Sequence, residues 1–375
     1  RTGVESAADR VRRGAELYAQ SRYLDAHREL ESLGPYSTWS ALEGRVLASR
    51  ITRQLGAPRL SDALVWTTHR RHPQDHDARF QHAILLLRRR GPLPTLRWLR
   101  AHPPPSEAAA ELRADFLAVE ANCLTWLRDF EEASDRCERA RRLAPEDPWV
   151  LVEQAFLEGQ RDRPEAALEL ARAALALRPS YRPALLSLAH QLTDLRRPEE
   201  AVALLDASAS QSYTVHHYRA ELWLQLGDPA RAEAAAHEAL EAAPLVELAV
   251  ERGLRALRAE AFYRARRYRR ARRELEGIER PFERRFREAL ARLGDGASPP
   301  RIELQVPYVR QDHVTCAPAS LTSLAAYYGR AVDHDAVAEE ICYAGTSSSR
   351  ERRWATENGF VARELGPNGP AFMAE

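Results

Sequence analysis

The sequence of 375 residues has no lysine, one methionine and four cysteines. All 55 basic residues are arginine, and 54 acidic residues leave a net charge of +1. This balance excludes the strong basic field with which many proteins attract nucleic acid or anionic membranes. The replacement of every lysine by arginine is typical of a GC-rich genome, and selection for arginine–carboxylate networks is the alternative interpretation.

Cys123, Cys137, Cys316 and Cys342 are too few and too irregularly spaced for a disulfide scaffold or a zinc site. We therefore expect reduced thiols, a cytoplasmic protein, and neither a cofactor nor a metal. No apolar run has the length of a membrane-spanning helix. Because the chain begins at Arg1, a removed signal peptide stays an alternative.

The sequence is rich in a helical pattern that repeats about every 34 residues. Small residues four and then three apart, followed by proline, recur as Ala133, Cys137, Ala140 and Pro145, as Ala167, Ala171, Ala174 and Pro179, and as Ala232, Ala236, Ala239 and Pro244. This spacing puts the small residues on one helix face, where a neighbouring helix packs closely, and the proline ends the helix. The pattern resembles the tetratricopeptide repeat, whose period is also about 34 residues.

We predict a mostly α protein in which residues 1–293 form an α-solenoid of six to seven helix pairs, although residues 40–115 keep the pattern poorly. Cys123 and Cys137 are expected to be buried, inert thiols at packing positions. Such solenoids present a groove for peptides or protein segments, so we expect a peptide or protein partner there. A rigid spacer or an oligomerisation platform is the alternative.

Residues 251–292 contain 15 arginines, 7 glutamates and no aspartate. One interpretation is a solvated face of the last helices. The other is a basic surface that selects acidic segments or docks the next domain. Nucleic acid is the weaker option, because few aromatic side chains are present for base stacking.

The composition changes at residues 294–301, where glycines and prolines predict a linker to a second domain over 302–375. Within residues 302–309, IELQVPYV, β-branched and aromatic residues predict a short strand bounded by Pro307. The following residues predict a helix that begins near Cys316 and ends at Gly329.

Cys316 therefore lies at the positive end of a predicted helix. This position favours a thiolate, the reactive form of cysteine, and the exposed amides of the first turn can bind an oxyanion. Gln311, five residues earlier, can supply a further amide donor. Cys342, at the end of the next predicted helix, is expected to be a packing thiol.

Residues 302–365 resemble the double-glycine leader peptidases and their stand-alone relatives, which are papain-like cysteine peptidases of bacteria. The resemblance rests on Gln311, Cys316, the small-residue helix, Tyr327–Tyr328–Gly329 and Glu357–Asn358–Gly359–Phe360. It implies the N-terminal part of a papain-like α+β domain, with Cys316 as nucleophile and Gln311 in the oxyanion hole. Cys316–Ala317 replaces the Cys-Gly of transporter-linked members, which favours the stand-alone branch.

The family takes its catalytic histidine and its aspartate or asparagine from a later sheet. Only 59 residues follow Cys316, and His334 is the one histidine among them, so we expect this domain to be incomplete as given. His334, between Asp333 and Asp335, is interpreted most simply as a solvated turn residue, and would act as base only if its turn folded back onto Cys316. His313 is too close in sequence for good base geometry.

Two functions follow. The first is a cysteine peptidase or related acyl transferase, whose repeats recruit the substrate. The second is an inactive peptide-binding adaptor built on the same scaffold. Whether the chain is an enzyme stays open, because a matching histidine and aspartate are missing.

Overall fold

The computed structural model describes residues 6–293, 304–312, 314–343 and 345–362. The chain divides into two compact units, Arg1–Ala297 and Ser298–Glu375. The described residues form 20 α-helices and no strand, so the prediction of a mostly α protein is confirmed. The predicted linker, 294–301, lies outside the described residues. None of the described helices combines the length and the apolar character needed to cross a bilayer.

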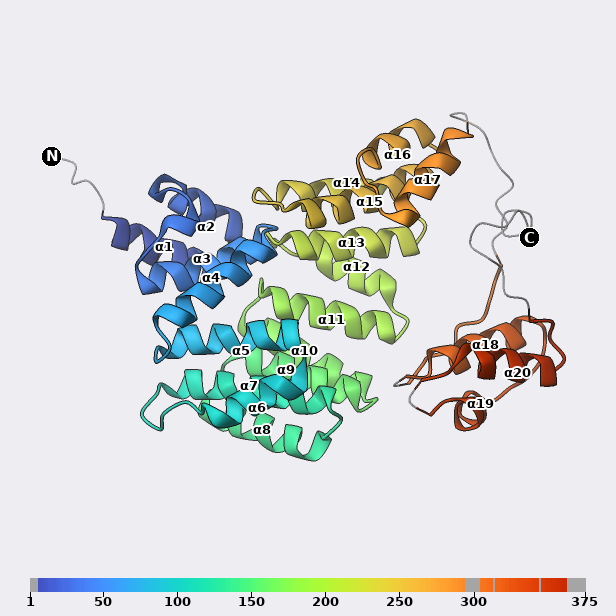
Figure 1. The fold of residues 1–375 in the computed structure, drawn as a ribbon, viewed down its shortest axis with the longest axis horizontal. Coiled ribbons are helices and arrows are strands. Elements are labelled where there is room, and N and C mark those ends of the chain that lie inside the picture. The colour runs from blue at the N-terminus through green and yellow to red at the C-terminus, as the bar shows by residue number, and fades with distance from the viewer. Residues whose placement is uncertain (1–5, 294–303, 313, 344, 363–375) are drawn as a thin grey trace. The chain divides into compact units, whose positions relative to one another are not determined.

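The first unit is a succession of helix pairs closed by a single helix (Figure 1). The pairs are α1 (Ala7–Ala19) with α2 (Tyr23–Leu30), α3 (Leu42–Gln54) with α4 (Pro58–Arg71), α5 (His76–Arg90) with α6 (Pro92–Ala101), α7 (Ala110–Trp126) with α8 (Phe130–Leu143), α9 (Pro148–Gln160) with α10 (Pro164–Leu177), α11 (Arg182–Asp194) with α12 (Pro198–Ala207), α13 (Tyr213–Gln225) with α14 (Pro229–Glu241), and α15 (Leu248–Arg264) with α16 (Tyr268–Glu274). Helix α17 (Pro281–Ala291) follows them. Two short 3₁₀ turns, Glu31–Leu33 and Tyr36–Thr38, connect α2 to α3.

The eight pairs in the described residues exceed the six to seven predicted from the sequence. The undercount comes from residues 40–115, which form α3 to α6. Larger side chains such as Leu64, Leu96 and Leu99 fill the interior there, so these helices pack without the small-residue pattern.

Similar turns join the helices in seven of the eight described pairs, whereas in the α5–α6 pair the single residue Gly91, with a ψ of −177°, lies between the helices. One residue in each turn has a left-handed backbone, with φ between 58° and 89°: Ser21, Gly56, Gly91, Arg128, Asp162, Arg196, Gly227 and Arg266. Only glycine adopts this conformation without steric cost, yet five of the eight positions carry another residue. The turn geometry is therefore imposed by the packing of the two helices, and not by glycine alone.

The small residues of the repeat pattern lie in the core, as predicted. Ala133, Ala140, Ala167 and Ala171 have no exposed surface, and Cys137 has almost none. Close contact at these positions lets neighbouring helices approach.

The two cysteines of the solenoid, Cys123 and Cys137, are buried. Burial raises the pKa of both Cys123 and Cys137 to about 12, because a thiolate loses its hydration in the core. The prediction of packing thiols is confirmed.

The solenoid closes on itself, which the sequence did not predict. The backbone N–H of Leu245 donates to the carbonyl of Leu55 at 3.1 Å, and that of Glu247 donates to the carbonyl of Gly56 at 2.9 Å. The Glu247 carboxylate also accepts from the N–H groups of Arg59 and Leu60, both at 2.9 Å. The N-terminus of α4 is therefore capped by a side chain 188 residues away, and the turn between α3 and α4 contacts the segment between α14 and α15.

A second set of bonds supports the closure at α2. Gln211 accepts from the N–H of Leu24 at 2.9 Å and donates to the Asp25 carboxylate at 3.1 Å. Gly56 contacts Ala243, just after α14, and the contact is possible because glycine has no Cβ. A Cβ at position 56 would lie only 2.9 Å from the Cβ of Ala243, which is too close. The second and the seventh pairs are thus in direct contact.

The second unit contains α18 (Cys316–Tyr327), α19 (His334–Ile341) and α20 (Ser348–Glu357). Its small core consists of Ala325, Val337, Ile341 and Trp354. The predicted strand over 302–309 does not form in the described part, 304–309. A strand needs a neighbour for its backbone hydrogen bonds, and the described residues of this unit offer helices instead.

The ends of α18 and α20 meet. Gly329 closes α18 with a φ of 74°, as predicted, and Gly359 closes α20 with a φ of 75°. The Arg330 guanidinium lies over the Phe360 ring at 4.4 Å and donates to the carbonyl of Asn358. The two motifs that carry the family resemblance in this unit thus pack against each other.

Candidate active site

Cys316 is the first residue of α18, and its side chain is exposed. The residue before it, Thr315, is the N-cap, but its hydroxyl bonds within the preceding turn. The Thr315 hydroxyl accepts a hydrogen bond from the N–H of Asp312 at 2.8 Å and donates one to the carbonyl of Asp312 at 3.1 Å. No N-cap side chain therefore covers the first-turn amides of α18, which stay oriented toward the region of Cys316.

The turn that leads into Cys316 is strained. Val314 has a φ of 58°, a left-handed conformation that is costly for a β-branched residue. The Cys342 thiol, at the end of α19, donates to the Val314 carbonyl at 3.3 Å. The contact of Cys342 with this turn has no signal in the sequence, which predicts only a packing thiol.

His334 opens α19 and contacts the same turn. Its Nδ1 lies 4.0 Å from the Asp312 carboxylate and 3.4 Å from that of Asp335. The side chain is only 14% exposed, and its Nε2 is buried without a hydrogen-bond partner in the described residues. His334 thus lies beside the N-cap Asp333 at the start of a helix, as expected, but its side chain is not solvated, because α19 folds back onto the turn at Asp312.

Asp312, His334 and Asp335 place their ligand atoms within 4.8 Å of one another, a separation at which they could hold a metal ion. Both aspartates are exposed, and exposed carboxylates commonly gather in this way without a metal. We assign no metal to them.

Gln311 lies exposed in the irregular stretch 304–312, just before this turn. No hydrogen bond within the described residues holds its side-chain amide. His313 lies outside the described residues. The structure thus gathers Asp312, Cys342 and His334 around the turn before Cys316, and leaves Gln311 exposed next to them.

Residues 303–366 match the sequence model of the Peptidase_C39 like family. This segment of the chain is similar to that family. The match covers Gln311, Cys316, His334 and all three helices of the second unit. No curated protein matches the chain in sequence.

Solved structures resemble the first unit. Yeast Tom70 has a TM-score of 0.50 at 12% identity, with 77% of this chain and 65% of Tom70 covered. The APC/C hetero-tetramer Cut9-Hcn1 gives a TM-score of 0.45 at 13% identity, over 74% of this chain and 54% of that chain. A tetratricopeptide repeat protein from Parabacteroides merdae gives a TM-score of 0.38 at 16% identity, over 67% of this chain and 98% of that chain. The likeness to Tom70 concerns the fold alone, and with the eight described pairs and the 34-residue sequence period it agrees with a tetratricopeptide-type solenoid joined to a Peptidase_C39-like segment.

Proposed function

We propose that the second unit processes a peptide or protein with Cys316 as nucleophile, and that the helical repeats recruit the substrate or partner. The observation that carries this proposal is the exposed thiol at the first position of α18, inside the segment similar to the Peptidase_C39 like family. Reduced thiols suit this chemistry, so we place the protein in the cytoplasm.

In the proposed reaction, the Cys316 thiolate attacks the carbonyl carbon of a peptide bond. The oxyanion that forms is stabilised by the first-turn amides of α18 and by the side-chain amide of Gln311. The C–N bond then breaks, the amine leaves with a proton, and water hydrolyses the thioester to release the acid.

The proton transfers need a base, and His334 is the candidate within the described residues. Its Nδ1 faces two carboxylates, and its Nε2 has no partner, which is the arrangement of a histidine oriented by an acidic group. The second candidate function, an inactive peptide-binding adaptor, is favoured by the ion pairs of His334, which are with aspartates and not with the Cys316 thiol.

Iodoacetamide labelling across pH tests the proposal on the full chain. We expect Cys316 to be alkylated near neutral pH faster than an ordinary thiol, because the first-turn amides of the helix stabilise the thiolate. The Cys342→Ala variant should keep this fast labelling, and Cys316→Ala should lose it. A labelling rate equal to that of an ordinary thiol rules out an activated nucleophile and leaves the adaptor.

The same experiment tests the role of His334. If His334 acts on Cys316, His334→Ala slows the labelling of Cys316 near neutral pH. An unchanged labelling rate excludes His334 as the partner of the thiol.

The repeats offer a basic surface to acidic segments. Helix α16 and the turn before it expose the arginines Arg266, Arg267, Arg269, Arg270, Arg272 and Arg273. We propose that acidic segments of the partner bind this surface, so that replacing Arg272 and Arg273 by glutamine weakens the binding of an acidic peptide.

A further inference from the structure

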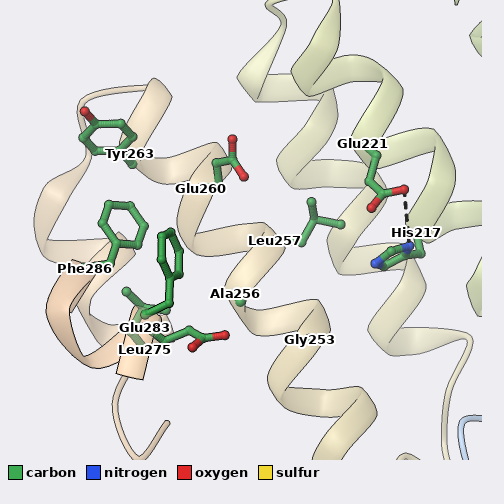
Figure 2. A pocket seen from close by; sticks show the side chains of 11 residues that line it. His217, Glu221, Gly253, Ala256, Leu257, Glu260, Tyr263, Leu275, Glu283 and Phe286 are labelled. Carbon is green, nitrogen blue, oxygen red and sulfur yellow. Dashed lines mark ion pairs between the residues drawn. The ribbon is translucent and has the colours of Figure 1, made fainter. Parts of the chain in front are cut away.

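A hollow of about 420 Å³ lies between α13, α15 and α17 at the C-terminal end of the solenoid (Figure 2). Gly253, Ala256 and Leu257 of α15 form its floor. Gly253 has open space above it, since a Cβ there would meet no atom within 4 Å. The hollow can therefore admit part of another molecule.

The charged side chains that line the hollow are acidic. Glu221 comes from α13, Glu260 from α15 and Glu283 from α17, and Figure 2 shows the Glu283 side chain extending toward α15. Although residues 251–292 are rich in arginine, no arginine is among the lining residues that the structure describes. Arg264 and Arg280 reach two of these carboxylates without lining the hollow, so the wall that faces an entering molecule is acidic within an arginine-rich region.

The carboxylates keep capacity for another cation. The partner of Glu221 is the His217 ring at 3.8 Å, and that of Glu283 is Arg280 at 3.8 Å. Glu260 pairs with Arg264 at 2.6 Å. An ionised carboxylate accepts several hydrogen bonds, and pairs as long as 3.8 Å leave these acceptors available.

Aromatic rings stand on one side of the hollow. The Phe282 side chain is 75% exposed, which is unusual for a residue of this size. Phe286 lies 6.2 Å from it and contacts Tyr263 edge-on at 5.3 Å. A guanidinium or an ammonium group is attracted to the face of such rings, and its alkyl chain covers their apolar surface.

We propose that this hollow binds a basic segment of the protein partner, with an arginine or lysine side chain placed between the three carboxylates and the aromatic rings. Charge complementarity selects this occupant, because an acidic segment would face Glu221, Glu260 and Glu283. The inference deepens the proposed function, since it rests on recruitment of a partner by the repeats. It assigns the basic part of that partner to the hollow and leaves acidic parts to α16.

The test is fluorescence anisotropy with the full chain carrying Cys316→Ala, so that no peptide is cleaved. The probes are a labelled peptide of alternating arginine and leucine and a matched peptide with glutamate in place of arginine. We expect the Glu221→Gln/Glu260→Gln variant to bind the basic peptide about tenfold more weakly, because two charge-assisted contacts are lost. Phe282→Ala should weaken it about threefold through the lost ring contact.

The matched control is Glu288→Gln, an exposed carboxylate on α17 that does not line the hollow. It removes a charge from the same helix and should leave the affinity unchanged. The acidic peptide should not lose affinity in the Glu221→Gln/Glu260→Gln variant.

Four results would overturn the proposal. Three concern the peptide: no binding of the basic peptide, an equal loss of affinity in Glu288→Gln, and an affinity that both hollow variants leave unchanged. The fourth is self-association of the protein that the hollow variants abolish, since a second copy would then be the occupant. Cys316 labelling is measured separately, so failure of the hollow and failure of the nucleophile are distinguishable.

Discussion

Glu153 lies in the core of the solenoid on α9, next to Asn122, whose side-chain amide donates to it at 2.6 Å. Burial raises the pKa of Glu153 to about 7, because an ionised carboxylate would lose its hydration there. In the unfolded chain its pKa is the ordinary 4.5. Between these two values the unfolded state loses a proton that the folded state keeps, so stability falls as the pH rises from about 4.5 to about 7.

Replacing Glu153 by glutamine should therefore stabilise the protein at pH 8 and have little effect at pH 4. The neutral amide keeps an acceptor for Asn122 and removes the cost of the buried charge, which is about 3 kcal/mol for a pKa raised from 4.5 to about 7. Urea unfolding at both pH values measures the difference. Glu138→Gln, an exposed carboxylate on α8, is the control, and a gain of the same size in it would contradict the explanation.

At this scale the sequence predicted local features well and distant contacts poorly. The buried state of Ala133 and Cys137 follows from spacing within one helix. The burial of His334 does not, because the carboxylate of Asp312 that contacts it belongs to a different segment. The exposure and helix position of Cys316 agree with the proposed role, and its reactivity stays a prediction.

The turn within each helix pair is the recurring element of the solenoid. Gly227 adopts its left-handed conformation with open space where a Cβ would lie, whereas Arg266 adopts the same conformation with a Cβ. The sequence marks such turns only where glycine occupies them. At the other turns the packing of the two helices determines the left-handed backbone conformation.

Removing glycine from one turn and introducing it at an equivalent turn should change the free energy of unfolding in opposite directions. Gly227→Ala should lower the free energy of unfolding by about 1 kcal/mol, because alanine is strained at positive φ. Arg266→Gly should raise it by a smaller amount, since relief of strain is partly offset by the greater freedom of glycine in the unfolded chain. Thermal unfolding of the two variants measures both, and changes of the same sign would show that the turns are not equivalent.

For the whole molecule, the contact between the second and seventh pairs is the feature that local patterns could not predict. Periodicity in a sequence reports which face of a helix is buried by its neighbour. It contains no information on hydrogen bonds between Glu247 and residues 188 positions earlier. The number of pairs and their closure therefore had to come from the structure.

Glu247→Ala should weaken this closure. Loss of the carboxylate leaves the amides of Arg59 and Leu60 uncapped and should lower the unfolding free energy by about 1 kcal/mol. Hydrogen exchange at these amides should accelerate. Glu241→Ala, an exposed carboxylate at the end of α14, is the control, and equal exchange rates in the two variants would show that the cap is not needed.

The closure also constrains how this solenoid can evolve. An open array of repeats gains or loses a unit at little cost, because each unit contacts only its neighbours. Here Gln211 and Glu247 must reach α2 and α4, and one repeat more or less would move these groups out of register. We therefore expect relatives of this protein to vary in their surface residues and loops while keeping the number of repeats between α2 and α14 fixed.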